Sequence, residues 1–451
     1  MSMPTFHLAP DLAVSRLCFG TMTMGEQSRL PESLRLLDAA FDAGVNFFDS
    51  AEMYPVPQRS ETHGRSEEFL GRWLRARRAP RDSVVLATKV AGPSGEMTWI
   101  RGGPASLDSR NIAEAIDGSL RRLGVDYIDL YQIHWPDRYV PMFGETEYDP
   151  SHQYMSVPME EQLLALGRAI DAGKIRYIGL SNETPYGLMK FLQLSRDSQL
   201  HSKILTVQNS YNLLCRNFDA GLAECCHHER INLLAYSPMA MGILSGKYYS
   251  SDDGGPPDAR MNLFKGRYSE GESRYNLQNP KMKAAVKEYV KISAKHGISP
   301  AILAVAFVLR HPLVSSAVFG ATEISQLTEV LQATRIHLSE EIVAEINEIA
   351  NLQCHMIIRR YSEGESRYNL QNPKMKAAVK EYVKISAKHG ISPAILAVAF
   401  VLRHPLVSSA VFGATEISQL TEVLQATRIH LSEEIVAEIN EVHARYPNPC
   451  P

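Results

Sequence analysis

The chain has 451 residues, of which 45% are apolar and 22% are charged, and its formal net charge is −3. This composition is typical of a globular protein, and it lacks the basic excess that binds nucleic acid or an anionic membrane surface. The most apolar run, Pro300 to Leu309, is too short to cross a bilayer, and the N-terminus carries no secretory or transit signal. We therefore expect a cytoplasmic protein with no nucleic-acid or membrane partner.

Short apolar, β-branched runs alternate with segments of helical periodicity along most of the chain. The strands expected from this pattern are 14–20, 45–51, 83–90, 127–135, 175–182, 203–211, 231–238 and 314–321. Eight nearly continuous apolar strands, each followed by a helix, favour an α/β fold in which a parallel sheet closes into a (β/α)8 barrel of the TIM type. Residues 4–13 are expected to form a hairpin over the barrel floor.

Three long segments, 55–64, 91–110 and 137–158, interrupt this regular alternation. Each follows a predicted strand, so each should lie at the carboxyl ends of the strands. Barrel enzymes build their active sites at this end, and we expect a site there.

An exact internal repeat occupies the C-terminal part of the chain. Residues 267–348 recur letter for letter at residues 360–441, at an offset of 93. Solenoid repeats are short and imperfect, so one long exact pair indicates a duplicated coding segment or an error in joining the gene. We predict a barrel over 1–348, a linker over 349–359, a surplus or competing copy over 360–441 and a tail over 442–451.

The first copy supplies the last barrel helices and strand, so it can close the barrel alone. The second copy would add a ninth strand at 407–414, for which the barrel has no place. Either copy can take the closing position, although loop entropy favours the first by about 1 kcal/mol at most. The spare copy would keep apolar surface exposed, so we expect a tendency toward homo-oligomers or domain swapping.

The cysteines and histidines do not predict a metal site. Six cysteines are scattered without a disulfide framework, which fits a reducing compartment. The cluster Cys225-Cys226-His227-His228 consists of neighbours on one helix that point in different directions, and no second ligand group stands at finger spacing. We interpret it as helix surface.

Four polar residues stand at or near the ends of successive early strands: Asp49, Tyr54, Lys89 and His134. Together at the barrel mouth they suit the protonation of an alkoxide as a hydride reaches a carbonyl carbon. A lysine ammonium beside Tyr54 should lower the pKa of its hydroxyl, and Asp49 should keep Lys89 charged and oriented. A hydrogen bond from His134 would orient the carbonyl oxygen.

Several motifs, in order along residues 4–348, resemble the aldo-keto reductase family. They are GTMTMGE, DSAEMYPVP, ATKVAGPS, YIDLYQIHWP, IRYIGLSNET, VQNSYNLL, LLAYSPMAMGILSGKY and FGATEISQL. The sequences of these motifs are most similar to the bacterial Tas-like branch of the family, which is related to the voltage-gated potassium channel β subunits. The resemblance implies NADPH-dependent reduction of aldehydes or ketones, with Asp49, Tyr54, Lys89 and His134 as catalytic residues and Tyr54 as the proton donor.

The same resemblance implies a cofactor site for NADP, to which Asp49 also belongs. Ser181, Asn182 and Gln208 would bind the nicotinamide carboxamide, and Tyr236 would stack on the ring. The resemblance implies that the nicotinamide ribose contacts Gly20, Thr21 and Met22. It implies that the pyrophosphate contacts Ser237, Pro238, Met239, Lys247 and Arg260. It implies that the adenosine phosphate contacts Gly320, Thr322, Gln326 and Glu329.

The substrate pocket is expected at Tyr54, His134 and Trp135, with Trp135 as a wall. Two other functions stay open. One is a redox-sensing regulatory subunit, which would bind the cofactor with little turnover, as the channel β subunits do. Those subunits often lack the catalytic histidine, whereas this chain keeps it as His134. A non-functional product would result if the repeat prevented barrel closure.

Overall fold

The computed structural model describes residues 3–142, 145, 148–198, 203–250, 254–353 and 373–446. The chain divides into two compact units. One comprises Met1–Tyr148 and Gln153–Ile349, and the other comprises Asp149–His152 and Ala350–Pro451.

Eight parallel strands of the first unit close into a barrel, in the spatial order β10-β3-β4-β5-β6-β7-β8-β9. Their bounds are β3 Leu17–Gly20, β4 Phe47–Asp49, β5 Val85–Val90, β6 Ile128–Ile133, β7 Ile175–Ser181, β8 Ile204–Ser210, β9 Asn232–Tyr236 and β10 Val314–Phe319. Strands β5, β6 and β10 are buried along their whole length, as expected of strands covered on both faces. The predicted (β/α)8 barrel is confirmed.

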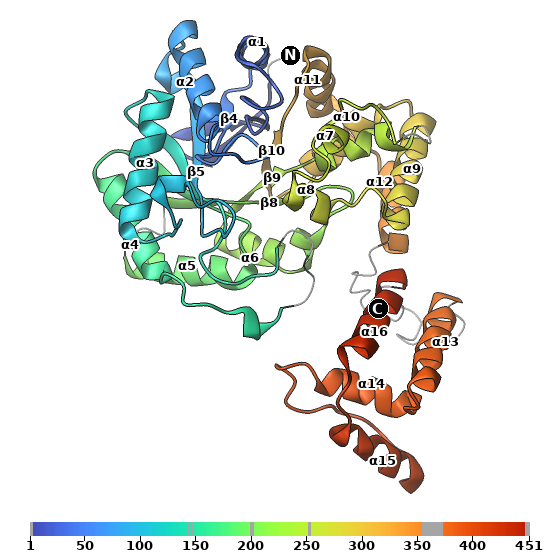
Figure 1. Ribbon diagram of the computed structural model, residues 1–451. Coiled ribbons are helices and arrows are strands. Elements are labelled where there is room, and N and C mark those ends of the chain that lie inside the picture. Colours follow the sequence, from blue (N-terminus) through green and yellow to red (C-terminus); the bar gives the residue numbers. More distant parts are fainter. Residues whose placement is uncertain are drawn as a thin grey trace. The chain divides into compact units, whose positions relative to one another are not determined.

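Helices surround the strands (Figure 1). They are α1 Leu30–Asp42, α2 Arg65–Arg77, α3 Ser109–Leu123, α4 Met159–Asp171, α5 Pro185–Asp197, α6 Leu222–Glu229, α7 Arg260–Leu263, α8 Ser269–Arg274, α9 Pro280–Lys295, α10 Pro300–Leu309, α11 Ile324–Gln332 and α12 Glu340–Gln353. Local signals set several ends: the Thr184 hydroxyl caps α5, the Ser299 hydroxyl caps α10, and Gly124 adopts the left-handed conformation after α3.

No single helix in the described ranges is long and apolar enough to cross a membrane. Only two bent pairs reach that length and composition, α9 with α10 and the helices of 373–388 and 393–402, and they bend by 96° and 95°.

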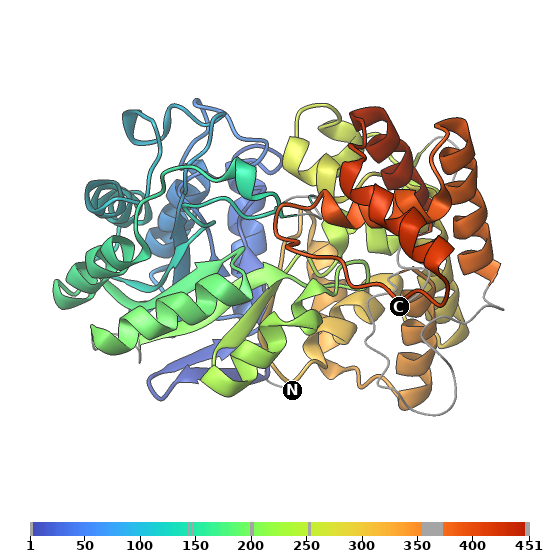
Figure 2. The ribbon, with the colours of Figure 1, turned by 90° about the horizontal axis from the view of Figure 1, so that it is seen from below.

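An antiparallel hairpin of β1 (Thr5–Ala9) and β2 (Leu12–Ser15) closes one end of the barrel, shown in dark blue in Figure 2. Its Leu8, Leu12 and Val14 pack with apolar side chains from the barrel interior. The expected strand 14–20 is therefore divided at Arg16, because its first residues belong to the hairpin and the rest to β3. The opposite end, where the strands terminate, is left open for a site.

The first copy of the repeat closes the barrel. Strand β10 pairs with β3 on one side, with Val318 opposite Cys18, and with β9 on the other, with Val318 opposite Tyr236. The ring of Phe319 meets that of Phe19 edge-on, with centroids 5.3 Å apart. The contacts with β3 join residues about 300 positions apart in the sequence, and together with those to β9 they complete the sheet without the second copy.

The second copy forms four helices at the positions that the first copy predicts: α13 Pro373–Lys388, α14 Pro393–Leu402, α15 Ile417–Leu424 and α16 Glu433–Arg445. Their apolar residues make a core of their own, which includes Ile385, Leu396, Ile435 and Ile439. The ion pairs also recur. Lys388 Nζ lies 3.1 and 2.5 Å from Glu434 and Glu438, as Lys295 Nζ lies 3.3 and 2.8 Å from Glu341 and Glu345.

The ninth strand expected at 407–414 does not form. Residues 407–412 repeat the sequence of β10, yet none of them lies in a strand. A strand needs hydrogen-bonded neighbours, and β10 takes its own from β3 and β9, which the chain contains once. The helices reform in the second copy because their hydrogen bonds are local.

Candidate active site

Four polar side chains meet at the open end of the barrel. Asp49 is the last residue of β4, Lys89 lies near the end of β5, and His134 directly follows β6. Tyr54 lies in the loop after β4. Because the carboxyl ends of parallel strands meet at one edge, residues from three separate strands are brought together.

A buried ion pair forms the floor of this site. The Lys89 ammonium donates hydrogen bonds to the Asp49 carboxylate and, at 2.7 Å, to the backbone carbonyl of Ser50. Lys89 Nζ lies 5.1 Å from the centre of the Tyr54 ring. Buried charges are tolerated when they are paired and hydrogen-bonded, so the pair holds a positive charge under the tyrosine.

Two glutamine amides hold the second oxygen of the Asp49 carboxylate. Asp49 Oδ2 accepts hydrogen bonds from Gln132 Nε2 at 2.9 Å and from Gln208 Nε2 at 3.0 Å, and Gln208 Nε2 also lies 3.2 Å from Gln132 Oε1. Gln208 was expected to bind the nicotinamide carboxamide, but its amide nitrogen is engaged with Asp49. Gln132 was not predicted. The available signal was a polar residue two positions before His134, which places both side chains on one face of the strand.

Burial dominates the ionisation of both reacting groups. It raises the pKa of Tyr54 well above its usual value, and the Asp49 carboxylate raises it further. The net pKa of Tyr54 is therefore raised and not lowered as expected, because the hydroxyl is desolvated. Burial, aided by the Lys89 charge, lowers the pKa of His134 well below its usual value. Its imidazole is thus neutral at physiological pH.

His134 faces Tyr54 edge-on, with ring centres 5.5 Å apart. Its Nδ1 is buried and has no hydrogen-bond partner among the described residues. Trp135 packs beside it, with ring centres 4.9 Å apart, and its indole donates to the carbonyl of Pro93 at 2.9 Å. The indole is fixed in this orientation, and it forms a wall of the site as expected.

A cavity of about 780 Å³ opens above the four residues. The predicted site residues that line it are Gly20, Met22, Asp49, Tyr54, His134, Trp135, Ser181, Asn182, Gln208, Tyr236, Ser237, Pro238, Met239, Lys247, Arg260, Gly320, Thr322, Gln326 and Glu329. Two predicted residues lie behind the wall. Lys89 is fully buried beneath the other site residues. Thr21 is also buried, and its hydroxyl donates a hydrogen bond to the backbone carbonyl of Asp49 at 3.2 Å.

The residues expected around the nicotinamide form one hydrogen-bonded chain. Tyr236 Oη donates to Asn182 Oδ1 at 2.6 Å, Asn182 Nδ2 donates to the backbone carbonyl of His134 at 2.8 Å, and Ser181 Oγ donates to that of Gln208 at 2.9 Å. Asn182 adopts a left-handed backbone, with φ of 53°. This backbone conformation is uncommon for residues other than glycine, and the hydrogen bonds to Tyr236 and His134 stabilise it.

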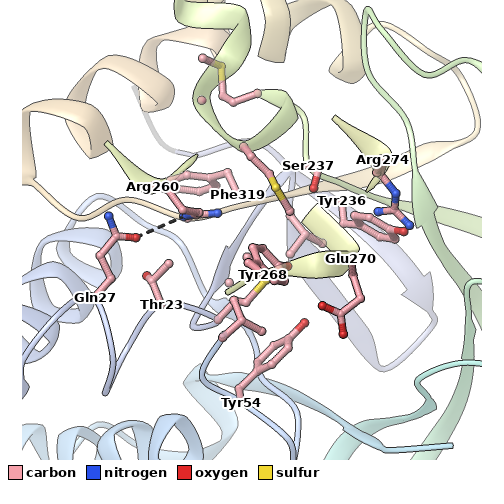
Figure 3. A pocket seen from close by; sticks show the side chains of 18 of the residues that line it. Thr23, Gln27, Tyr54, Tyr236, Ser237, Arg260, Tyr268, Glu270, Arg274 and Phe319 are labelled. Carbon is pink, nitrogen blue, oxygen red and sulfur yellow. Dashed lines mark hydrogen bonds between the residues drawn. The ribbon is translucent and has the colours of Figure 1, made fainter. Parts of the chain in front are cut away.

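Two cations lie at the far end of the cavity. Burial lowers the pKa of Lys247, and the neighbouring Arg260 charge lowers it further; burial also lowers the pKa of Arg260. Among the described residues, the hydrogen bond of the Arg260 side chain is to the amide oxygen of Gln27, at 3.4 Å (Figure 3). An anion between Lys247 and Arg260 would relieve both the burial of charge and its repulsion.

Helix α8 and its N-cap residue add three cavity residues that sequence reasoning missed: Tyr268, Glu270 and Arg274 (Figure 3). Glu270 accepts a hydrogen bond from Gln58 Nε2 at 2.8 Å, and the Arg274 guanidinium lies 5.2 Å from the centre of the Tyr236 ring. They are among the first residues of the repeat. The sequence therefore indicated their place in the duplicated segment and gave no sign of their place at the site. Their counterparts in the second copy lie outside the described residues.

The chain belongs to the aldo/keto reductase family. The family's sequence model matches residues 16–351 and again residues 357–444. The closed barrel and the polar residues at its mouth agree with this assignment, which places the protein among oxidoreductases that act on carbonyl groups.

Three relatives illustrate the range of the family near this chain. Protein tas of Escherichia coli K12 is 42% identical over 346 residues, which cover 76% of this chain and 97% of tas. A probable voltage-gated potassium channel subunit beta of rice is 31% identical, over 75% of this chain and 93% of its own length. Aldo-keto reductase yakc [NADP(+)] of Schizosaccharomyces pombe is 29% identical, over 83% and 99%. The resemblance to the Tas-like and channel-subunit branches is thereby confirmed.

Proposed function

We propose that the protein reduces aldehydes or ketones to alcohols with NADPH, and that Tyr54 donates the proton. One observation carries this proposal: the paired Lys89 and Asp49 lie beneath Tyr54, with the neutral His134 beside it, in one cavity. This set supplies a proton donor, a charge that stabilises the phenolate left behind, and a neutral hydrogen-bond donor for the carbonyl oxygen.

The residues of the cavity fit a phosphate-bearing nicotinamide cofactor, which would supply the hydride. The half-buried pair Lys247 and Arg260 matches an anionic group such as a pyrophosphate. Ser181, Asn182 and Tyr236 present polar groups at the other end of the cavity, next to Tyr54. The relative from S. pombe, whose name includes NADP(+), supports NADP over NAD.

Each catalytic side chain then has one task. The Tyr54 hydroxyl donates its proton to the carbonyl oxygen, and the Lys89 ammonium stabilises the resulting phenolate. Asp49 keeps Lys89 charged, and Gln132 and Gln208 fix the orientation of the carboxylate. The His134 imidazole donates a hydrogen bond to the carbonyl oxygen from its protonated nitrogen, and its lowered pKa keeps it neutral in that role.

The test is the oxidation of NADPH by the purified full-length protein with a panel of aromatic and aliphatic aldehydes. Tyr54→Phe should reduce kcat by about 10²–10⁴-fold, because it removes the hydroxyl that donates the proton and keeps the ring. Tyr268→Phe is the matched control, since Tyr268 lines the same cavity without belonging to the four residues. It should retain most of the activity. Equal turnover by Tyr54→Phe and the unmodified protein would refute Tyr54 as the donor.

A second candidate is a redox-sensing regulatory subunit, favoured by the similarity to the rice channel subunit. It predicts tight binding of NADPH, measured by quenching of tryptophan fluorescence, with negligible oxidation by any carbonyl. The placement of His134 beside Tyr54 favours the reductase, because a protein that only binds the cofactor has no need of a carbonyl-orienting group.

A further inference from the structure

A further buried ion pair lies next to the catalytic residues, and the reaction described above does not use it. Glu52 and Arg101 meet with their side chains 2% and 6% exposed. Glu52 is two residues before Tyr54 in the loop after β4, and Arg101 lies in the loop after β5. Neither side chain lines the cavity of the site, but both line a second cavity of about 420 Å³. The pair can therefore affect the site only through its neighbours.

Glu52 ties the loop of Tyr54 to the strand of Lys89. Its backbone nitrogen donates to the carbonyl of Lys89 at 3.1 Å, and its carboxylate accepts from the backbone nitrogen of Ala91 at 2.6 Å. Burial raises the pKa of Glu52, and the Arg101 charge opposes this rise. A buried carboxylate needs its cation to stay ionised, and the ionised form is the stronger acceptor. The contact with Ala91 therefore depends on Arg101.

The Arg101 guanidinium also organises the loop that contains it. It donates to the Glu52 carboxylate and, at 2.9 Å, to Asn111 Oδ1. It donates as well to the backbone carbonyls of Ala91 at 3.1 Å and Ser106 at 3.3 Å. The backbone of Arg101 is left-handed, with φ of 50°, which is uncommon for residues other than glycine. Such a backbone persists where surrounding contacts hold it, and here the residue's own side chain makes them.

The loop around Arg101 forms a wall of the site. Four of its residues line the cavity, and one of them, Pro93, accepts the hydrogen bond of the Trp135 indole. Trp135 in turn packs beside His134. Loss of the guanidinium would therefore disturb the wall next to His134 as well as the loop that Glu52 holds.

We propose that Arg101 is a positioning residue for carbonyl reduction, and that its ion pair with Glu52 holds the loop of Tyr54 against the strand of Lys89. The inference rests on the proposed function, because its readout is the rate of that reaction. A displacement of about 1 Å can lower a rate about 10²-fold. Among the described residues, none to which Arg101 donates lines the cavity, so the binding of NADPH should not change.

The test variant is Arg101→Ala, assayed at saturating NADPH with the best aldehyde of the panel. We expect kcat to fall about 10–100-fold, while the dissociation constant of NADPH, measured by quenching of tryptophan fluorescence, stays within about twofold. The shortened side chain leaves a space that opens into the second cavity, through which guanidinium ion reaches Glu52. About 50 mM guanidinium chloride, far below the molar range that unfolds proteins, should restore much of kcat. Sodium chloride at the same concentration is the salt control.

Arg81→Ala is the matched control. Arg81 also pairs with a buried carboxylate, that of Asp129 at 2.6 Å, and donates to the backbone carbonyls of Val84 and Tyr127. It lies near the amino ends of β5 and β6, at the opposite end of the strands from the site. The variant should lose stability in urea without a change in kcat and without a response to guanidinium.

A lower kcat that guanidinium restores, with unchanged NADPH binding and an unaffected Arg81→Ala, supports the proposal. A kcat within about threefold of the wild type, a loss that guanidinium does not reverse, or an equal loss in Arg81→Ala would overturn it. If circular dichroism shows that Arg101→Ala does not fold, Arg101→Lys decides. It keeps a charge beside Glu52 without the planar fork, so a kcat about tenfold lower supports the proposal and an unchanged kcat overturns it.

The same assay separates this proposal from the proposed function. A wild-type protein that oxidises no NADPH with any aldehyde overturns the reductase assignment, and this role of Arg101 with it. Wild-type turnover that Arg101→Ala leaves unchanged overturns only the role of Arg101.

Discussion

The closing strand offers a direct test of whether the second copy can replace the first. Phe319 is 3% exposed and packs edge-on against Phe19. In a chain with residues 349–441 deleted, one copy of the repeat runs directly into Val442. There, Phe319→Ala removes a buried aromatic ring with no substitute, and the free energy of unfolding should fall by about 3–5 kcal/mol.

The full chain holds an intact substitute with Phe412 in place of Phe319. If the second copy takes the closing position, the connection from Tyr236 to the closing strand roughly doubles, since the strand then starts at Val407 instead of Val314. A doubling of loop length costs about 0.6 kcal/mol. Phe319→Ala in the full chain should therefore cost about 1 kcal/mol at most, because exchange limits the loss.

Urea unfolding followed by tryptophan fluorescence measures this difference cleanly. The chain has three tryptophans, Trp73, Trp99 and Trp135, and all precede the repeat, so the signal reports the barrel. Phe412→Ala in the full chain is the control; its ring is 40% exposed, and we expect a change within about 0.5 kcal/mol. Equal losses for Phe319→Ala in the two chains would refute the reasoning and show that the second copy cannot close the barrel.

Three further predictions concern the site. Asp49→Ala leaves the Lys89 ammonium buried without its carboxylate, so the free energy of unfolding should fall by about 3–5 kcal/mol in urea titrations; a loss below about 1 kcal/mol would contradict the ion pair. Gln132→Leu removes one of the two amide donors to Asp49, and we expect a loss of about 1–3 kcal/mol together with a lower kcat at unchanged KM for NADPH. An unchanged kcat would show that Gln132 has no positioning role. The rate of carbonyl reduction should be flat from about pH 7 to 9. His134 has a lowered pKa and gains its proton only below the usual value of about 6.5, while Tyr54 has a raised pKa and loses its proton only above about 10. A midpoint inside that range in the pH profile of kcat would exclude both assignments.

Much of the site follows from the sequence because the barrel converts order along the chain into position in space. A polar residue at the end of an apolar strand must face the barrel mouth, so Asp49, Lys89 and His134 could be placed together from their positions alone. Gln132 could have been included by the period of two along its strand. The segment 268–274 could not, because nothing in its sequence indicates that Tyr268, Glu270 and Arg274 line the cavity.

The ionisation of Tyr54 shows a second limit. Pairwise reasoning correctly places Lys89 near the tyrosine, at 5.1 Å from its ring, and from this it predicts a lowered pKa. The packed site instead raises the pKa, because the desolvation of the hydroxyl depends on every surrounding atom and not on one neighbour.

The repeat separates most clearly what the sequence by itself determines from what tertiary structure decides. The same residues form the same helices twice, and even the ion pairs of Lys295 recur at Lys388, because these contacts are made within the segment. The residues of β10 form a strand once. Their hydrogen-bonding partners, β3 and β9, lie far away in the sequence and occur once, so only the folded barrel decides which copy becomes the strand.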